Sequence, residues 1–323
     1  MFVQHRPPAI AARGLRKAYG EHVVLDGIDI TVPEGTVYSL LGPNGAGKTT
    51  TVQILSTLIA ADAGEVTIGG HDLATDKRAI RGHIGVTGQF AAVDELLTGR
   101  ENLRLMGDLH HLPRREVEQT AEDLLRRFDL VDAADKTAAS YSGGMTRRLD
   151  LAMTLVGTPR VIFLDEPTTG LDPRSRRTMW EMIRGLVDDE GVTVFLTTQY
   201  LEEADQLADR IAVLDRGRIV ADGTADELKR TVPGGHIRLR FADRDRLDAA
   251  ARALGETARV VGAAEEFTLA VPSDGGVAAL RGVLDDLDAA RVEIDGLAVH
   301  TPTLDDVFLT LTGQSTTETE TAA

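Results

Sequence analysis

Eight consecutive residues, from Gly42 to Thr49, satisfy the pattern G-x-x-x-x-G-K-[ST] at each specified position. Glycines let the backbone fold around an anion with successive N–H groups pointing inward, and a helix that follows offers its positive end. In such a loop, Lys48 is expected against the β- and γ-phosphates of a nucleotide, and the Thr49 hydroxyl on Mg²⁺. The sequence therefore predicts a phosphate-binding loop made of Gly42, Pro43, Asn44, Gly45, Ala46, Gly47, Lys48 and Thr49.

Two carboxylates follow an uninterrupted apolar run. Residues 161–164 have the composition of a strand buried in a parallel sheet, and they are followed by Asp165 and Glu166. Open α/β sheets place ligands at the carboxyl ends of their strands. Because successive residues point in different directions, one carboxylate can reach Mg²⁺ while the other faces a water. An acidic pair at a strand end is common, so this prediction depends on the phosphate-binding loop.

The tripeptide Ser142-Gly143-Gly144 opens a stretch that is expected to be helical to about Gly157. Serine is a favoured N-cap residue, and glycines let a ligand approach a helix start. On its own the tripeptide is a weak signal, because Ser-Gly-Gly usually forms a loop. Its meaning depends on the motifs around it.

The segments beside the phosphate-binding loop have the character that the motif requires. Residues 36–41 are apolar enough for a buried parallel strand and 49–58 are expected to be helical, which gives the strand, loop and helix order. Two further strands end close to glutamines, Gln89 and Gln199. Short strands are expected at 64–70, 84–87, 192–197, 211–214 and 217–220.

Residues 10–19 and 23–32 alternate apolar and polar side chains on either side of a turn at Gly20. This alternation predicts two antiparallel strands of an edge sheet. Tyr19 lies just before the turn, where its ring could stack on a base. Ordinary strand packing is the alternative for this side chain.

Residues 90–139 change to a helical pattern. Within them, 114–128 carry apolar side chains at three- and four-residue spacing, which predicts an amphipathic helix. We therefore expect a helical insertion here, and a further helix at 174–188.

The character of the chain changes again after residue 230, where Pro233-Gly234-Gly235 predicts a linker. Beyond it the expected order is βαββαβ, which suggests a small ferredoxin-like α+β domain. Its elements are strand 236–241, helix 245–254, strands 259–261 and 267–271, helix 276–289 and strand 292–299. A last helix at 303–312 has one apolar face, and the Thr/Glu/Ala tail at 314–323 is expected to be disordered.

Composition limits the class of protein. The 323 residues are 42% hydrophobic and 27% charged, which is ordinary for a soluble globular protein, and their length suffices for two domains. The net charge of −16 disfavours non-specific binding to nucleic acid. With no cysteine, disulfides and cysteine-ligated zinc are excluded. No apolar run is long enough to span a membrane, and residues 1–8 lack a signal-peptide core.

In chain order, the phosphate-binding loop, Gln89, Ser142-Gly143-Gly144, Asp165-Glu166 and Leu171-Asp172 together resemble an ATP-binding-cassette (ABC) ATPase over residues 9–230. Two segments, QYLEEAD at 199–205 and TLDDVFL at 303–309, look more narrowly like the ATP-binding subunits of daunorubicin/doxorubicin-resistance exporters. The resemblance implies an α/β P-loop NTPase fold. Its mixed core sheet would carry a helical subdomain near 90–157 and an antiparallel β subdomain, followed by the α+β accessory domain at 231–313.

The resemblance also implies roles at the nucleotide. Tyr19 would stack on adenine, and residues Gly42 to Thr50 would hold the phosphates of ATP. Asp165 would bind Mg²⁺ directly or through water. Glu166 would polarise the water that attacks the γ-phosphate.

Other implied roles connect two subunits. Gln89 would contact Mg²⁺ and the attacking water while sensing the permease. Ser142, Gly143 and Gly144 would lie at the γ-phosphate of ATP held by the opposite subunit, and Asp172 would lie at the dimer seam. Such proteins work as head-to-tail dimers that sandwich two ATP molecules.

The sequence departs from the family pattern at three places. Tyr141 and Met145 stand where leucine and glutamine are usual, and Gly170 stands in the loop before Asp172. Gln199 takes the position of the switch histidine. An amide cannot titrate near pH 7, so Gln199 could bind the γ-phosphate only through neutral hydrogen bonds.

The expected function is therefore that of a Mg²⁺-dependent ATPase subunit, dimeric and held on the cytoplasmic side of a membrane by permease subunits on a separate chain. Hydrophobic drugs or antibiotics are the expected cargo. A soluble ABC ATPase acting on DNA or ribosomes is an alternative that the acidic charge disfavours. An importer ATPase is a further alternative, which would share every catalytic motif and against which only the C-terminal domain argues.

Overall fold

The computed structural model describes residues 8–232, 235–255, 258–261, 267–273 and 276–313. The chain divides into two compact units, Met1–Ala225 and Asp226–Ala323, and each is considered by itself. Residues 1–7 of the segment that we expect to precede the ATP-binding domain as an N-terminal tail (1–8), the linker at Pro233-Gly234 and the tail at 314–323 lie outside the described residues.

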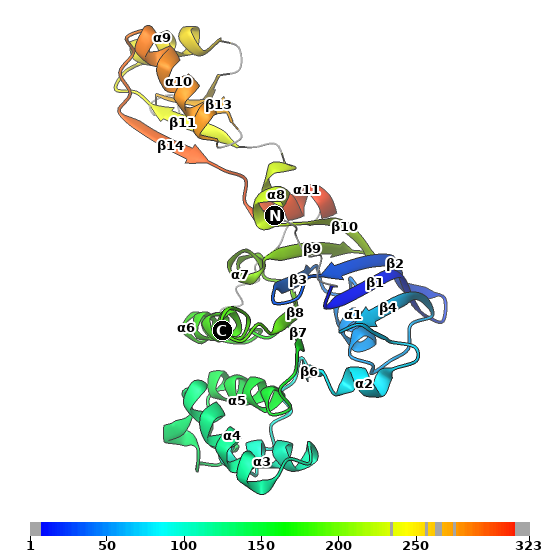
Figure 1. Ribbon diagram of the computed structural model, residues 1–323. Coiled ribbons are helices and arrows are strands. Elements are labelled where there is room, and N and C mark those ends of the chain that lie inside the picture. The colour runs from blue at the N-terminus through cyan, green and yellow to red at the C-terminus, as the bar shows by residue number, and fades with distance from the viewer. Residues whose placement is uncertain (1–7, 233–234, 256–257, 262–266, 274–275, 314–323) are drawn as a thin grey trace, which may run out of the picture. The chain divides into compact units, whose positions relative to one another are not determined.

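Six strands form the central sheet of the first unit in the order β10-β9-β3-β8-β7-β6 (Figure 1). All neighbours pair in parallel except β9 and β10, which are antiparallel. Every residue of β3, β7 and β8 is buried, which agrees with the uninterrupted apolar run at 161–164 and the largely apolar stretches expected to be strands at 36–41 and 192–197. The bounds are β3 Val37–Leu41, β6 Ile84–Thr87, β7 Val161–Asp165, β8 Thr193–Thr198, β9 Arg210–Asp215 and β10 Arg218–Gly223.

Alternate residues of β7 face two different hydrophobic cores. Ile162 and Leu164 pack in one core with apolar side chains of the helical region, whereas Val161 and Phe163 pack in another with those of the antiparallel sheet. Because β6, β7, β8 and β3 run in parallel, their carboxyl ends meet at one edge of the sheet. This edge carries the polar side chains of the candidate site.

A second, antiparallel sheet in this unit has the order β2-β1-β4-β5. The two strands predicted on either side of Gly20 are confirmed as β1 and β2, which pair from Ile10↔Val32 to Tyr19↔His22. The bounds are β1 Ile10–Tyr19, β2 His22–Val32, β4 Ala63–Ile68 and β5 His71–Asp72.

The helices of the first unit differ from prediction mainly at their ends. The first helix ends at Leu55 rather than at residue 58, because Thr57 adopts a left-handed φ of 68°. The helical region starts at Gly99 rather than at residue 90, where Thr98 and Glu101 form a capping box. The short α2 and α7 were not predicted. The bounds are α1 Lys48–Leu55, α2 Lys77–Arg81, α3 Gly99–Leu109, α4 Arg114–Arg127, α5 Gly143–Leu155, α6 Pro173–Asp188 and α7 Leu201–Leu207.

The second unit has the predicted ferredoxin-like βαββαβ order, with a four-stranded antiparallel sheet arranged β12-β13-β11-β14. Its own core includes Ile237, Leu239, Leu247 and Leu269. The last strand was predicted at 292–299 but spans 296–300, because β11 offers only five positions with which it can pair. The bounds are α8 Ala225–Arg230, β11 His236–Arg240, α9 Arg244–Leu254, β12 Arg259–Val261, β13 Thr268–Pro272, α10 Val277–Ala289, β14 Gly296–His300 and α11 Leu304–Thr312.

The last helix, α11, begins at a capping box formed by Thr303 and Asp306. It buries Leu304, Val307 and Phe308, which confirms the apolar face that was predicted. Among the described residues, no helix combines the length and the hydropathy that crossing a membrane would require.

Candidate active site

The predicted phosphate-binding loop connects β3 to α1 and is closely surrounded. A side chain at Gly42 would collide with the backbone carbonyl of Leu214 in β9. Gly47 has a φ of 111°, and a Cβ there would lie 2.7 Å from Leu25 Cδ2 in β2. The glycines of the motif are thus required by the packing of this loop as well as by its turn.

The lysine of the loop is buried at the end of β7. Lys48 Nζ donates hydrogen bonds to the carbonyl oxygens of Gly42 at 2.8 Å and Pro43 at 3.2 Å. It also forms an ion pair with Glu166, 3.3 Å from Oε1, in which both side chains are less than a tenth exposed. Burial lowers the pKa of Lys48, while the charge of Glu166 opposes that shift.

Glu166 follows β7 in a left-handed backbone conformation, with φ of 50°. Non-glycine residues rarely adopt this conformation, at a cost of about 1–3 kcal/mol. Two contacts hold the turn, because the Glu166 N–H lies 3.1 Å from both the carbonyl oxygen and the Oγ1 of Thr197. Its Oε2 accepts a hydrogen bond from Thr169 Oγ1 at 3.3 Å. The backbone turn therefore directs this carboxylate toward Lys48.

Asp165 is the other carboxylate. Its Oδ1 accepts hydrogen bonds from Thr197 Oγ1 at 2.5 Å and from Thr49 Oγ1 at 3.3 Å. A carboxylate beside a hydroxyl at a phosphate-binding loop suits Mg²⁺, which proteins usually hold through one or two carboxylates together with the phosphates of a substrate. The described residues contain no group of three or more histidine, cysteine, aspartate or glutamate side chains placed to hold a metal ion.

The two glutamines follow the strands on either side of β7. Gln89 is exposed just beyond β6, and Gln199 is partly buried just beyond β8. Within the described ranges neither side chain has a hydrogen bond of its own. Tyr19 is 52% exposed at the end of β1, with Lys17 Nζ 5.5 Å from its ring centroid.

Ser142 caps α5, since its Oγ accepts the N–H of Met145 at 3.3 Å. Gly144 packs against α6, where a Cβ would lie 2.7 Å from Ser175 Oγ. Asp172 caps α6 and accepts a 2.6 Å hydrogen bond from that same Ser175 hydroxyl. These hydrogen bonds lower the pKa of Asp172. Ser142-Gly143-Gly144 and Asp172 are thus linked to each other, and no described hydrogen bond joins them to the phosphate-binding loop of the same chain.

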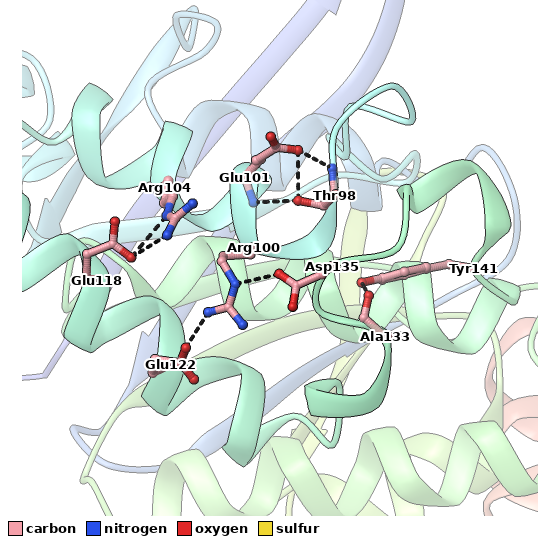
Figure 2. Close-up of polar contacts among 9 residues, drawn as sticks. All are labelled: Thr98, Arg100, Glu101, Arg104, Glu118, Glu122, Ala133, Asp135 and Tyr141. Carbon is pink, nitrogen blue, oxygen red and sulfur yellow. Dashed lines mark hydrogen bonds and ion pairs between the residues drawn. The ribbon is translucent and has the colours of Figure 1, made fainter.

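Tyr141, one of the departures from the family pattern, is anchored in the helical region (Figure 2). Its hydroxyl donates to the carbonyl oxygen of Ala133 at 2.7 Å, and its ring lies so close to Gly99 that a side chain there would collide with it. Ion pairs join the same region: Arg100 with Asp135 and Glu122, and Arg104 with Glu118.

The structure thus brings together Lys48, Thr49, Asp165 and Glu166, and it places Gln89 and Gln199 at the same edge of the sheet. Sequence reasoning missed Thr197, which bonds the carboxylate of Asp165 and the backbone N–H of Glu166, although a polar residue ending a buried strand beside β7 is a usable signal. It also gave no role to Arg147, which is buried beside the turn at Glu166.

Known proteins match the chain over most of its length. The ABC transporter family model matches residues 25–169. The chain is 52% identical over 305 residues to the daunorubicin resistance ATP-binding protein DrrA3 of Streptomyces coeruleorubidus, covering 94% of this chain and 96% of that protein. It is 45% identical over 315 residues to the daunorubicin/doxorubicin resistance ATP-binding protein DrrA of Streptomyces peucetius, covering 94% and 92%.

A relative with a different cargo is the Nod factor export ATP-binding protein I of Rhizobium sp. (strain N33), 35% identical over 311 residues and covering 95% of this chain and 97% of that protein. Among solved structures, an ATP-binding subunit of an ABC transporter superposes with a TM-score of 0.62 at 29% identity, over 69% of this chain and 92% of that one. A post-hydrolysis dimer of the ATP-binding cassette MJ0796 bound to ADP and Pi gives a TM-score of 0.61 at 26% identity, over 67% and 98%. The chain therefore belongs to the ABC transporter family, as an ATP-binding, ATP-hydrolysing subunit.

Proposed function

We propose that this ATPase powers the export of hydrophobic drugs or antibiotics through permease subunits on a separate chain. Similarity to daunorubicin and doxorubicin resistance proteins over nearly the whole chain supports the cargo class. The observation that carries the catalytic part is the cluster of Lys48, Glu166 and Asp165 at the carboxyl end of β7. Assembly with a permease would hold the subunit on the cytoplasmic side of a membrane.

In this proposal the phosphate-binding loop, including Thr50, holds the phosphates of ATP, and Tyr19 stacks on the adenine. Lys48 exchanges its bonds to loop carbonyls for the β- and γ-phosphates. Glu166 acts as general base toward the attacking water, and Gln199 hydrogen-bonds the γ-phosphate.

Thr49, Asp165 and Gln89 would hold Mg²⁺, which neutralises charge that develops on the phosphates. The Thr49 hydroxyl lies 3.3 Å from Asp165 Oδ1, which supports a shared ligand position for this ion. Thr197 would keep Asp165 oriented through its own hydroxyl.

The subunit would work as a head-to-tail dimer, in which Ser142, Gly143, Gly144 and Asp172 face the nucleotide of the partner. Two observations support this part: these residues have no described hydrogen bond to the loop of their own chain, and the similar cassette MJ0796 is dimeric. We further propose that residues 9–230 form the ATP-binding domain and 231–313 an accessory domain.

Substitution of Glu166 by Gln tests the catalytic assignment. The amide still fills the space beside Lys48 but cannot take a proton, so kcat should fall by about 10²–10⁴-fold while ATP still binds. The measurement is ATP hydrolysis by the full chain with its permease in lipid, together with fluorescence titration of an ATP analogue.

The matched control is Glu181→Gln, which changes an exposed glutamate on α6. This control should retain its activity. Equal turnover by the Glu166→Gln variant and the unsubstituted chain would contradict the assignment of Glu166. Hydrolysis that the permease does not change would count against the transport role.

A further inference from the structure

Arg147 lies on the second turn of α5 and is buried. Its guanidinium group uses all five of its N–H groups as donors. Nε bonds the carbonyl oxygen of Pro167 at 2.9 Å, Nη1 bonds Gly88 O at 2.9 Å and Asp150 Oδ2 at 3.3 Å, and Nη2 bonds Asp165 O and Glu166 O, both at 3.3 Å.

Three of these acceptors are the consecutive carbonyl oxygens of Asp165, Glu166 and Pro167. They can converge on one cation because the left-handed backbone at Glu166 reverses the chain there. Arg147 and Thr197 thus both hold this turn: Arg147 bonds its carbonyl oxygens, and Thr197 accepts the N–H of Glu166. Its planar fork suits several fixed acceptors at once, which an ammonium group does not.

The same side chain also holds the segment that contains Gln89. Arg147 bonds the carbonyl of Gly88, directly before Gln89, and its ion-pair partner Asp150 accepts the N–H of Ala92 at 2.9 Å. One turn of α5 therefore fixes both ends of the segment 88–92.

We propose that Arg147 is a positioning residue that couples the helix begun by Ser142-Gly143-Gly144 to Glu166 and Gln89 of the same subunit. It touches no substrate in this proposal, which rests on the proposed roles of Glu166 and Gln89. Because α5 starts at the residues proposed to face the nucleotide of the partner, a shift of α5 would move the catalytic turn of its own subunit.

The test compares Arg147→Met and Arg147→Lys with Arg148→Gln in the full chain assembled with its permease. Arg148 is the matched control, because it lies on the same helix and also bonds backbone carbonyls, those of Phe128 and Asp129, but does not contact the catalytic turn. Misplacing a catalytic group by about 1 Å can cost 10²-fold, so Arg147→Met should lower kcat by about that factor.

A fall in kcat without a change in nucleotide affinity distinguishes a positioning role from a general structural role. The affinity for an ATP analogue should stay within about twofold, because the phosphate-binding loop makes no described bond to Arg147, and Arg147→Lys should recover part of kcat. In a Glu166→Gln background, Arg147→Met should cause no further loss. Arg148→Gln should keep kcat.

Two failures can be told apart. If Glu166→Gln leaves turnover unchanged, the proposed catalytic role is wrong. If Glu166→Gln abolishes turnover while Arg147→Met or Arg147→Lys keeps full kcat, only the coupling proposal is overturned. Should Arg147→Met fail to fold, as judged by thermal melting, the Arg147→Lys variant decides between these outcomes.

Discussion

Gln199 is the residue at which this site differs most from the pattern of its family. It follows β8 at the edge where Asp165 and Glu166 end β7, and it is partly buried. An amide in this position carries no charge and does not titrate between pH 5 and 8, unlike an imidazole. Any pH dependence of turnover in this range must therefore come from other groups.

Substitution of Gln199 by Ala should lower turnover by about 10²-fold, the usual cost of losing one donor to a developing charge. Gln206→Ala, which removes an exposed glutamine on α7, is the control and should have no effect. Steady-state ATP hydrolysis and nucleotide titration are the measurements. Unchanged affinity and turnover in Gln199→Ala would show that this side chain has no role at the phosphate.

At this scale the sequence predicted those site residues that belong to contiguous motifs. Lys48, Asp165 and Glu166 belong to short sequence patterns that can be recognised without knowing which other residues lie close to them. Arg147 could not be assigned, because its role depends on carbonyl and carboxylate groups of distant segments that only the fold brings close. The ion pair between Lys48 and Glu166 joins residues more than a hundred positions apart and was likewise not predicted.

Among the elements, α7 contributes a fully buried carboxyl group. Glu203 Oε1 accepts hydrogen bonds from Thr168 Oγ1 at 2.7 Å and from Trp180 Nε1 at 3.1 Å. The first partner lies in the loop after Glu166 and the second on α6, so this side chain joins three segments. Burial raises the pKa of Glu203 above its ordinary value of 4.5.

This shift predicts how stability depends on pH. Above pH 4.5 the unfolded chain releases the proton of Glu203 while the folded chain keeps it, so the free energy of unfolding should fall as pH rises toward the folded pKa. The slope within this window is about 1.4 kcal/mol per pH unit. In Glu203→Gln the part of the decline that comes from Glu203 should disappear.

Urea unfolding of both proteins between pH 5 and 8 measures the difference, with exposed Glu202→Gln as the control on the same helix. Parallel pH profiles for Glu203→Gln and the unsubstituted chain would mean that Glu203 does not hold its proton in the folded state.

The sequence predicted long periodic elements well and element ends poorly. The helix at 114–128 and the strand at 161–164 were found because their patterns repeat over several turns or are wholly apolar. Helix α7, with seven residues, is too short for a period to show. The start of the helical region depends on the capping box at Thr98, and the start of β14 depends on the length of β11. Hydrophobic periodicity gives information on neither.

The whole molecule consists of two units, each with a hydrophobic core of its own. Every contact described for the candidate site, including those of Arg147, lies within the first unit. The acidic net charge of −16 belongs to the complete chain and favours partners other than nucleic acid.

A chain that ends after Arg230, at the end of α8, should therefore fold and bind ATP but assemble poorly with its permease. The reason is that it loses the accessory domain, including α11, which we expect to serve in assembly. Nucleotide titration and co-purification with the permease from membranes are the measurements, and a chain that ends after Gly313 is the control. A chain ending after Arg230 that assembled and hydrolysed ATP like the full chain would refute this assembly role.

The five hydrogen bonds of Arg147 also determine which positions around it can accept substitutions. Four of the acceptors are backbone carbonyls, which every amino acid carries, so Gly88 and Pro167 could be exchanged for other residues without loss of those acceptors. The donor side has no such freedom, because no other natural side chain offers five N–H groups in one plane. Tolerance to mutation is thus unequal, because a network that joins several segments depends on only two side chains, those of Arg147 and its partner Asp150.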